Sequence, residues 1–302
     1  LTPKQRSVVD LLFDVNTASV SEICELCSVG TSVLKNLEKY GVISIFDKEI
    51  YRNPYKNIEV KEQKKIELTF EQSKAYDTYS NMLLNTGGSG LLYGVTGSGK
   101  TQVYLKLIDK ALENDRDVIV LVPEISLTPQ VLSIFHARYG DKVAVFHSGL
   151  SLGERNDEYK RSDRGEAKIA IGTRSAVFAP LHNLGLIIMD EEQENTYKSE
   201  RTPKYNTKDV AHFRCKYNKA LFLMTSATPS LETYSNALKG KYVLCELNER
   251  FGDAKLPHVI TVDMKQEMKN GNKSPISSKL KELISETIDN GKQAILLINR
   301  RG

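Results

Sequence analysis

Short apolar runs that alternate with longer polar stretches constrain the fold of this chain more than any other feature of its sequence. From Leu68 onward these runs read GLLYGV, DVIVLVP, KVAVF, KIAIGT, LGLIIMD and ALFLMTSA, and the stretches between them are helix-like. Strands of a parallel sheet that is covered on both faces are apolar along their whole length. The alternation therefore predicts an α/β domain over residues 69–259, with a parallel sheet between layers of helices.

Residues 1–55 have a different pattern and are expected to form a small domain of their own. LTPKQRSVVDLLF, SVSEICELC and TSVLKNLEKYGVI each carry apolar residues at helical spacing, and VISIFDKEIYRN alternates as a two-stranded wing does. Three helices and a β-ribbon predict a winged helix. Binding to DNA and binding to protein both stay open, because the third helix offers only Lys35 and Lys39 against Glu38.

Two further segments complete the expected organisation. Residues 56–68, KNIEVKEQKKIEL, are rich in charge without a firm period and predict a linker. From residue 260 a helix-like stretch, SKLKELISETIDNGK, precedes a strand-like one, QAILLINRRG. We therefore expect residues 260–302 to begin a further α/β unit.

Composition excludes several classes of protein. No apolar run approaches the roughly 18 to 20 residues of a membrane span, and the start of the chain lacks the layout of a secretory signal. The four cysteines, at positions 24, 27, 215 and 245, are spaced for neither a disulfide framework nor a four-ligand zinc site. A net charge of +4 is compatible with nucleic acid without deciding for it. We expect a cytoplasmic protein without a membrane partner.

The segment GVTGSGKT matches the phosphate-loop pattern G-x-x-x-x-G-K-[ST]. It follows the strand-like LLY and precedes the helix-like QVYLKLIDKALE, so backbone N–H groups and a helix N-terminus would face the phosphates of ATP. Lys100 is expected to reach the β and γ phosphates, and the Thr101 hydroxyl to coordinate Mg²⁺. The expected ATP-binding residues of the loop are Gly94, Val95, Thr96, Gly97, Ser98, Gly99, Lys100 and Thr101.

Carboxylates follow another apolar run in IIMDEEQ, residues 187–193. Beside a phosphate loop, Asp190 is expected to bind Mg²⁺ and Glu191 to orient or deprotonate the attacking water. The alternative is a solvated helix start that favours negative charge. Nothing in the sequence assigns a role to Glu192.

Small hydroxyl residues end a third run in TSATPS, residues 225–230. Thr225, Ser226 and Thr228 are expected to hydrogen-bond to the carboxylates and to couple the nucleotide to a second site. In isolation the segment is more typical of a Ser/Thr turn that ends at Pro229.

The order of phosphate loop, DEEQ and SAT is typical of superfamily 2 helicases. With LVPEISLTPQ, FHSGLSLGER, IGTRSAVFAP and LLINRRG, the chain resembles the PriA family of replication restart helicases from about residue 68 to its end. The resemblance implies a RecA-like lobe after a winged helix, with a second lobe beginning at residues 260–302. It also implies a fragment, because the family has a 3′-DNA-end-binding domain before such a segment and paired CxxC zinc motifs after it.

The resemblance assigns further residues. Gln72 would read the adenine edge, and Glu124–Gln130 and Gly172–Ser175 would track the DNA strand. Residues 195–209 resemble an aromatic-rich loop that couples DNA binding to hydrolysis, although an exposed charged loop is the plainer alternative. The DNA-binding residues so implied are Thr173, Arg174, Tyr197, Lys198, Arg201 and Tyr205.

Two positions depart from the family pattern. Gln193 stands where the family has His, and it can keep a hydrogen bond at this coupling position but cannot become cationic. Lys204 stands where the family has Arg, so bidentate phosphate contact is lost.

The implied function is an ATP-dependent 3′ to 5′ DNA helicase that recognises stalled or abandoned replication forks and initiates restart by primosome assembly. Its cofactors would be ATP and Mg²⁺, with zinc only in the downstream CxxC segment. Its partners would be forked or single-stranded DNA, other primosome proteins and single-stranded-DNA-binding protein. This segment alone would hydrolyse ATP poorly, because the family's arginine finger lies further along the chain. The alternatives are a winged-helix DNA-binding regulator with a nucleotide-switch domain and the translocase subunit of a restriction system.

Overall fold

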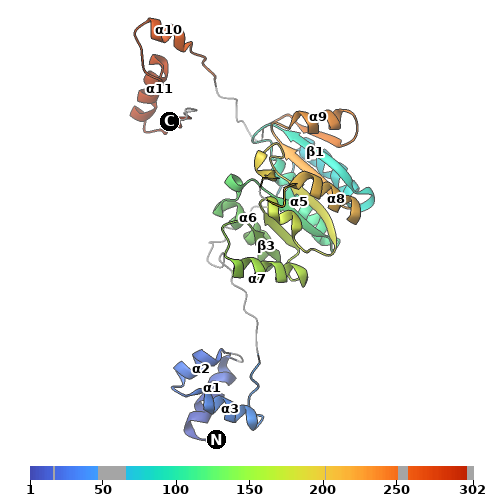
Figure 1. The fold of residues 1–302 in the computed structure, drawn as a ribbon, viewed down its shortest axis with the longest axis vertical. Helices are drawn as coiled ribbons and strands as arrows, with labels where there is room; N and C mark the ends of the chain where they lie inside the picture. Colours follow the sequence, from blue (N-terminus) through green and yellow to red (C-terminus); the bar gives the residue numbers. More distant parts are fainter. Residues whose placement is uncertain (16–17, 47–65, 201, 251–257, 298–302) are drawn as a thin grey trace.

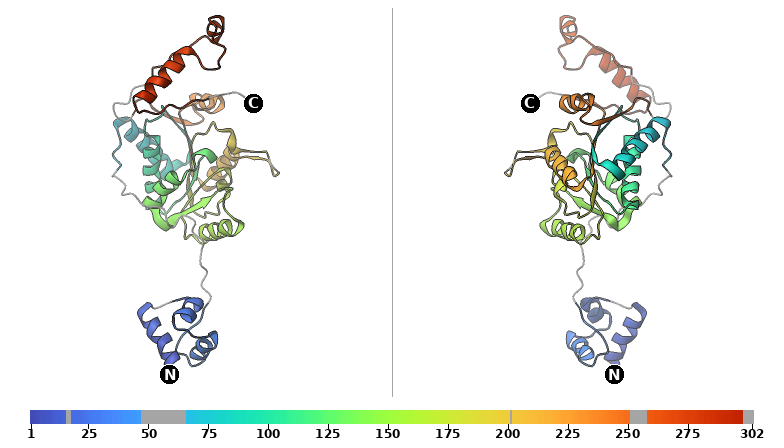
Figure 2. Two further views of the ribbon diagram at one scale, coloured as in Figure 1. Left: turned by 90° about the vertical axis from the view of Figure 1, so that its left-hand side faces the viewer. Right: turned by 90° about the vertical axis from the view of Figure 1, so that its right-hand side faces the viewer.

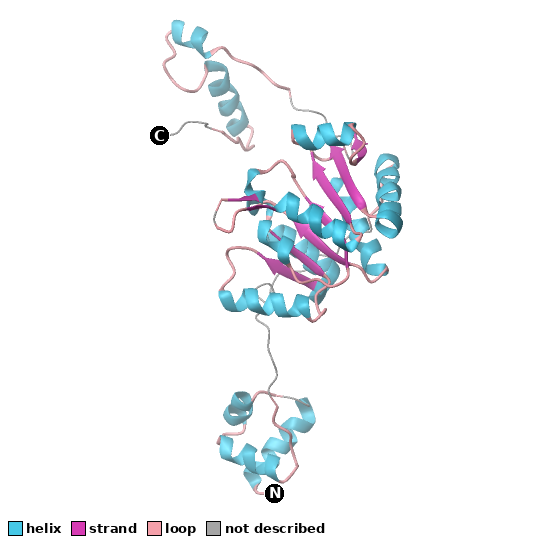
Figure 3. Ribbon diagram, turned by 45° about the vertical axis from the view of Figure 1, so that its right-hand side comes forward, coloured by secondary structure: helices cyan, strands magenta, loops and turns pink. Residues whose placement is uncertain are grey.

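A seven-stranded parallel sheet forms the centre of the α/β domain, with strand order β3-β4-β2-β5-β8-β1-β9. The computed structural model describes residues 1–15, 18–46, 66–200, 202–250 and 258–297. Helices lie on both faces of the sheet, as Figures 1 and 3 show. The α/β fold class with a parallel sheet is confirmed.

Each apolar run named above forms a strand of this sheet. The strands are β1 (Gly88–Gly94), β2 (Asp117–Leu121), β3 (Val143–Phe146), β4 (Ile169–Gly172), β5 (Leu184–Met189) and β8 (Leu221–Ser226). The sequence pattern missed β9 (Val243–Leu247), which pairs with β1 in the register Gly90↔Val243. An edge strand has fewer buried neighbours, and β9 is only partly buried, so it lacks the continuous apolar run of the inner strands.

Two sets of helices cover the two faces of the sheet. Alternate residues of β2 point to opposite sides, with Val118 and Val120 in one core and Ile119 and Leu121 in the other. The first core includes residues of α4 (Phe70–Asn81), α5 (Lys100–Glu113) and α6 (Pro129–Tyr139). The second includes residues of α8 (Thr207–Asn218), α9 (Leu231–Leu238) and the 3-10 helix η4 (Arg174–Phe178). Helix α7 (Leu152–Asp163) packs at the edge strand β3.

Short elements complete this domain. The π-helical turn η1 (Met82–Thr86) follows α4, and 3-10 turns form at η2 (Glu124–Ser126), η3 (Gly140–Lys142) and η5 (Asn195–Tyr197). Strands β6 (Lys198–Ser199) and β7 (Tyr205–Asn206) pair antiparallel, and this hairpin projects from the body of the domain (Figure 2). No helix in the described ranges is long and apolar enough to cross a membrane.

Helices α1 (Pro3–Val15), α2 (Val20–Leu26) and α3 (Thr31–Lys39) pack around a core that includes Val8, Leu34 and Leu37. The three helices expected in residues 1–55 are therefore present. Residues 42–46 of the expected wing form no strand, and residues 47–55 lie outside the described ranges. The winged helix stays a prediction, as does the linker, of which residues 56–65 also lie outside these ranges.

The segment after residue 258 contains α10 (Met264–Lys269) and α11 (Ser278–Asp289). Helix α11 matches the expected helix, but residues 293–297 of the expected strand form no strand. Ile295 and Leu297 are 97% and 94% exposed. A single strand without a neighbour leaves its backbone groups unpaired, which explains the difference.

Candidate functional site

The phosphate loop joins the end of β1 at Gly94 to the start of α5 at Lys100. Gly97 and Gly99 have φ angles of +82° and +81°, in the left-handed region that favours glycine. A Cβ on Gly99 would lie 2.4 Å from Nε2 of Gln72, so the loop also has no room for a side chain there. This conformation presents backbone N–H groups and the N-terminus of α5 together, which suits a phosphate group.

Lys100 is buried and its Nζ donates hydrogen bonds to the carbonyl oxygens of Gly94, at 2.7 Å, and Val95, at 3.5 Å. Burial lowers the pKa of Lys100, and the negative charges of Glu191 and Asp190 partly oppose that shift. The ammonium group thus lies in the field of the carboxylates predicted to act with it. Binding of phosphate would exchange the two carbonyl contacts for phosphate oxygens.

Residues near the loop fit a Mg²⁺-nucleotide complex. The Ser98 hydroxyl is buried and has no hydrogen-bond partner among the described residues, and Thr101, in the first turn of α5, is exposed. Across the described ranges no group of three or more His, Cys, Asp or Glu residues could hold a metal ion by itself. Mg²⁺ needs no such group, because in phosphate sites it keeps phosphate and water ligands beside one or two protein ligands.

Gln72 lies against the phosphate loop and is 2% exposed. Its Nε2 donates to the Ser98 carbonyl at 2.8 Å, and its Oε1 accepts the Thr69 backbone N–H at 3.0 Å. The side chain therefore connects the N-terminus of α4 to the loop. Each end retains further hydrogen-bonding capacity, since an amide group has two donors and an oxygen with two lone pairs.

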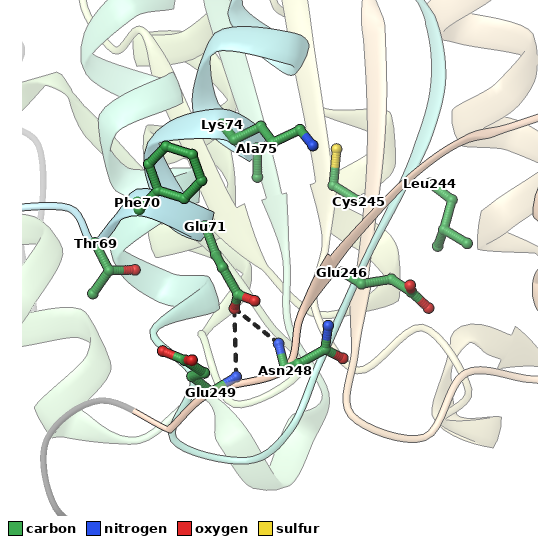
Figure 4. A pocket seen from close by; sticks show the side chains of 10 residues that line it. All are labelled: Thr69, Phe70, Glu71, Lys74, Ala75, Leu244, Cys245, Glu246, Asn248 and Glu249. Carbon is green, nitrogen blue, oxygen red and sulfur yellow. Dashed lines mark hydrogen bonds between the residues drawn. The ribbon is translucent and has the colours of Figure 1, made fainter.

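A cavity of about 650 Å³ lies between the start of α4 and the end of β9 (Figure 4). Glu71 closes one side by accepting the backbone N–H groups of Asn248, at 3.0 Å, and Glu249, at 3.4 Å. Phe70 and Lys74 also line it. The volume is within the roughly 300 to 1,000 Å³ of ordinary ligand sites.

Asp190 and Thr225 are brought together by the sheet, because β5 and β8 pair in the register Met189↔Met224. The Thr225 hydroxyl donates to Oδ1 of Asp190, which also accepts the Glu191 backbone N–H at 3.1 Å. Burial raises the pKa of Asp190, while the Thr225 hydroxyl and the charge of Lys100 lower it. A carboxylate at the end of a central strand, next to the phosphate loop, can serve as a metal ligand.

The other predicted coupling residues form a continuous chain of hydrogen bonds. Gln193 Nε2 donates to Glu191 Oε2 at 2.9 Å, and the Ser226 hydroxyl donates to Gln193 Oε1 at 2.6 Å. The Thr228 backbone N–H donates to the Ser226 hydroxyl at 2.9 Å. The amide of Gln193 thus bridges the end of β5 to the end of β8, so both of its functional groups are used.

Glu192, to which no role could be assigned from the sequence, has a completely buried side chain. Its carboxylate pairs with Lys208 and accepts hydrogen bonds from Ser230 and Thr233. Sequence reasoning missed these three partners. The only signal for them was their place near segments already singled out: Ser230 ends TSATPS, Thr233 lies three residues further on, and Lys208 falls within residues 195–209.

The predicted DNA-binding residues divide into exposed and buried groups. Lys198 is exposed on β6, and Tyr205 of β7 contacts Phe178 edge to face, with ring centroids 5.0 Å apart. Arg174 Nη1 donates to the Thr196 carbonyl at 3.3 Å, at the base of the hairpin. Arg201 lies outside the described residues.

Two of these predictions do not fit the structure. Tyr197 is 3% exposed, and its hydroxyl donates to the carbonyls of Leu121 at 3.0 Å and Asp190 at 2.6 Å. Its ring lies in the core with the ends of β2 and β5 and cannot stack on a base. Thr173 is 4% exposed, so its hydroxyl is not open to a DNA phosphate.

Residues 71–237, which hold the sheet, the phosphate loop and the DEEQ turn, match the model of the DEAD/DEAH box helicase family. The chain belongs to the DEAD/DEAH box helicase family. Within this helicase family it is 44% identical, over 93% of its length, to "Replication restart protein PriA" of Bacillus subtilis (strain 168). The protein of that name from Synechocystis sp. is 40% identical over 94% of this chain. The chain covers only 35% and 34% of those two relatives.

Solved helicases share the fold at much lower identity. The structure "RecG bound to three-way DNA junction" has a TM-score of 0.51 at 21% identity. The matched region covers 75% of this chain and 28% of the RecG chain. The helicase MrfA has a TM-score of 0.50 at 17% identity. The matched region covers 91% of this chain and 39% of the MrfA chain. These similarities support the helicase fold alone.

Proposed function

We propose that the chain carries the ATP-binding lobe of a 3′ to 5′ DNA helicase that recognises stalled or abandoned replication forks and initiates restart by primosome assembly. The observation that carries the proposal is that Lys100, whose Nζ bonds the Gly94 carbonyl at the end of β1, lies in the field of Asp190 and Glu191, which follow the end of β5. The relatives named for replication restart give the biological context, although the chain spans about a third of their length.

Each residue of the nucleotide site has a proposed task. The N–H groups of the phosphate loop and Lys100 hold the phosphates, and Thr101 and Asp190 would hold Mg²⁺, which neutralises phosphate charge when bound. Glu191 orients or deprotonates the attacking water. Gln72, which follows the cavity-lining Glu71 on α4, reads the adenine edge through its remaining hydrogen-bonding capacity.

The proposed DNA partner is forked or single-stranded DNA. Lys198 and Arg174, together with Arg201, supply positive charge to the phosphate backbone, and Tyr205 supplies an aromatic face. Other primosome proteins and single-stranded-DNA-binding protein are the proposed protein partners, and the helices of residues 1–46 are a candidate contact surface for DNA or protein. This chain alone binds ATP and hydrolyses it poorly, because a second lobe supplies the transition-state arginine.

The test is steady-state ATP turnover of the longest natural form of the protein that contains these residues, with and without forked DNA. Glu191→Gln should keep nucleotide affinity and lose roughly 100-fold or more in turnover, the usual contribution of a positioned general base. Glu194→Gln, in the same turn, is the matched control and should leave turnover unchanged. The proposal is contradicted if forked DNA does not change the rate of ATP turnover, or if Glu191→Gln turns over ATP as fast as the unchanged protein.

A further inference from the structure

We infer that Glu192 and Lys208 are positioning residues that transmit movement of the β6–β7 hairpin to Glu191. The inference rests on the proposed function, since it concerns how DNA at the hairpin would change the nucleotide site. It adds a second connection to the one through Gln193. Neither residue is among those proposed to bind the nucleotide, so both act through their neighbours.

The two residues belong to a buried polar cluster that joins three elements. Lys208 Nζ donates to Glu192 Oε2 and, at 2.9 Å, to the Thr233 hydroxyl, which itself donates to Glu192 Oε2 at 2.9 Å. The Ser230 backbone N–H donates to Glu192 Oε1 at 2.6 Å, and its hydroxyl to Oε2 at 3.2 Å. The cluster therefore ties the DEEQ turn to the N-termini of α8 and α9.

Glu191 is sensitive to the position of Glu192, which follows it directly. The φ angle of Glu191 is +46°, in a region that non-glycine residues rarely adopt and that persists only where the surroundings impose it. Glu192 supplies that constraint through its side-chain contacts and through its backbone N–H, which donates to the Thr225 carbonyl at 3.2 Å. A shift of Glu192 would therefore reorient the Glu191 carboxylate.

Lys208 connects the cluster to the hairpin. It lies in the first turn of α8, directly after β7, and its backbone N–H donates to the Asn206 side chain at 3.0 Å. A displacement of Tyr205 and Asn206 would thus move the backbone that carries the Lys208 ammonium group. The side chain of Lys208 is 20% exposed and that of Glu192 is 0% exposed, so solvent screens the pair little.

A purely structural role is the alternative to be tested. A buried ion pair adds little net stability over an apolar pair of similar volume, whereas removal of one partner leaves an uncompensated charge. The test variant therefore changes both residues, Glu192→Gln with Lys208→Met, which keeps side-chain volume. Thr233→Val is a second variant that keeps the ion pair and removes only the bridging hydroxyl.

The experiment measures binding of a fluorescent non-hydrolysable ATP analogue to this chain, with and without oligothymidine. If DNA and nucleotide sites are coupled, each ligand changes the affinity of the other by the same factor, commonly about 5 to 150-fold. We expect a factor in this range for the unchanged chain, a factor below about 2 for the double variant, and an intermediate factor for Thr233→Val. Lys216→Met, an exposed lysine on α8, should keep the factor of the unchanged chain.

A second measurement follows the hairpin itself. The chain contains no tryptophan, so Lys204→Trp, at an exposed hairpin position, provides a single reporter. The analogue should shift its emission in the otherwise unchanged chain, and the shift should disappear with Glu192→Gln and Lys208→Met.

The outcomes separate this inference from the proposed function. A double variant that loses stability to urea but keeps the coupling factor and the emission shift shows a structural role and overturns the inference. Binding of both ligands by the unchanged chain without coupling overturns the inference and leaves nucleotide and DNA binding intact. A chain that binds neither ligand overturns the proposed function, and the inference with it.

Discussion

The Lys100 ammonium group donates hydrogen bonds to two backbone carbonyls of its own phosphate loop and is partly desolvated by burial. A nucleotide would replace neutral oxygens by charged ones. Hydrogen bonds to charged groups contribute about 1.5 to 3 kcal/mol each, which corresponds to roughly 10 to 150-fold in affinity. The contribution of Lys100 to nucleotide affinity therefore comes from the hydrogen bonds of one atom, its Nζ.

Lys100→Ala should therefore weaken binding of a non-hydrolysable ATP analogue by about 10 to 150-fold. Lys106→Ala, on the same helix, is the matched control and should bind as the unchanged chain does. Titration with a fluorescent analogue measures both. Equal affinity of the two variants would contradict the assignment of this loop as the phosphate site.

The raised pKa of Asp190 predicts that magnesium binding depends on pH. Burial raises its pKa above the ordinary value of about 3.9, so the folded protein holds this proton more tightly than the unfolded chain does. Its contribution to stability is present below the unfolded pKa and is lost as the pH rises through the folded pKa. Because Mg²⁺ competes with the proton, the effect of Mg²⁺ on nucleotide affinity should grow as the pH rises through the raised pKa.

The measurement is nucleotide affinity with and without Mg²⁺ across the acidic to neutral range. Thr225→Val removes a hydroxyl that lowers the pKa of Asp190, so its transition should move to higher pH. Asp190→Asn should abolish the transition. A transition at or below the ordinary aspartate pKa, or one that persists in Asp190→Asn, would exclude Asp190 as the titrating group.

At the scale of elements, the contact between α4 and the phosphate loop gives a stability prediction. Gly97 and Gly99 have almost the same left-handed φ, but a Cβ on Gly97 meets no atom of the described residues within 4 Å, whereas one on Gly99 meets Gln72. Gly97→Ala should cost about 1 to 2 kcal/mol, the usual penalty of this conformation. Gly99→Ala should cost more, because the Gln72 amide must also move.

Urea denaturation of both variants measures this difference, and Gln72→Ala in the Gly99→Ala background supplies the check. Removal of the Gln72 side chain makes room for the new methyl group, so the two substitutions together should destabilise less than the sum of each alone. Additive effects would mean that the contact does not limit the loop.

The strands that the sequence predicted are the ones buried on both faces, since burial itself produces a continuous apolar run. The edge strand β9 escaped prediction because Val243 is 39% exposed and its neighbours are only partly buried. The segment around Ile295 has the residue types of a strand, but strand formation depends on a neighbour that no local pattern reveals. Local composition thus predicts the interior of the sheet better than its margins.

The candidate site likewise contains residues that the sequence placed correctly and residues that only the fold could place. Motif spacing placed Asp190, Gln193 and Ser226 together correctly, because the ends of neighbouring parallel strands meet at one edge. Their roles in coupling remain predictions. Tyr197 was misassigned because an aromatic residue beside a charged loop suits DNA as well as core, and only the fold decides between them. The role of Glu192 depends on Lys208, whose position relative to β5 the sequence does not give.

At the scale of the whole molecule, the N-terminal helices and the α/β domain have separate cores. Leu37 is fully buried among α1 to α3. Leu37→Ala should destabilise these helices by about 2 to 5 kcal/mol. Nucleotide affinity should stay unchanged, because none of the residues proposed to bind ATP lies in this core.

Thermal unfolding followed with and without the ATP analogue tests this independence. A ligand at 100 times its Kd stabilises the domain that binds it by about 2.7 kcal/mol. That stabilisation should be the same in the unchanged chain and in Leu37→Ala. A loss of nucleotide affinity in Leu37→Ala would show that the two cores are energetically connected.

The position of β1 between β8 and β9 also has a consequence during protein synthesis. The strand that ends in the phosphate loop pairs only with strands that are translated much later, through registers such as Gly88↔Leu221 and Gly90↔Val243. At about 5 to 20 residues per second, the ribosome needs about 7 to 26 seconds between Gly94 and Ser226, where β8, the first of these partner strands, ends. Throughout that interval the nascent chain displays an unpaired apolar strand, so chaperones that bind nascent chains have their longest opportunity at β1.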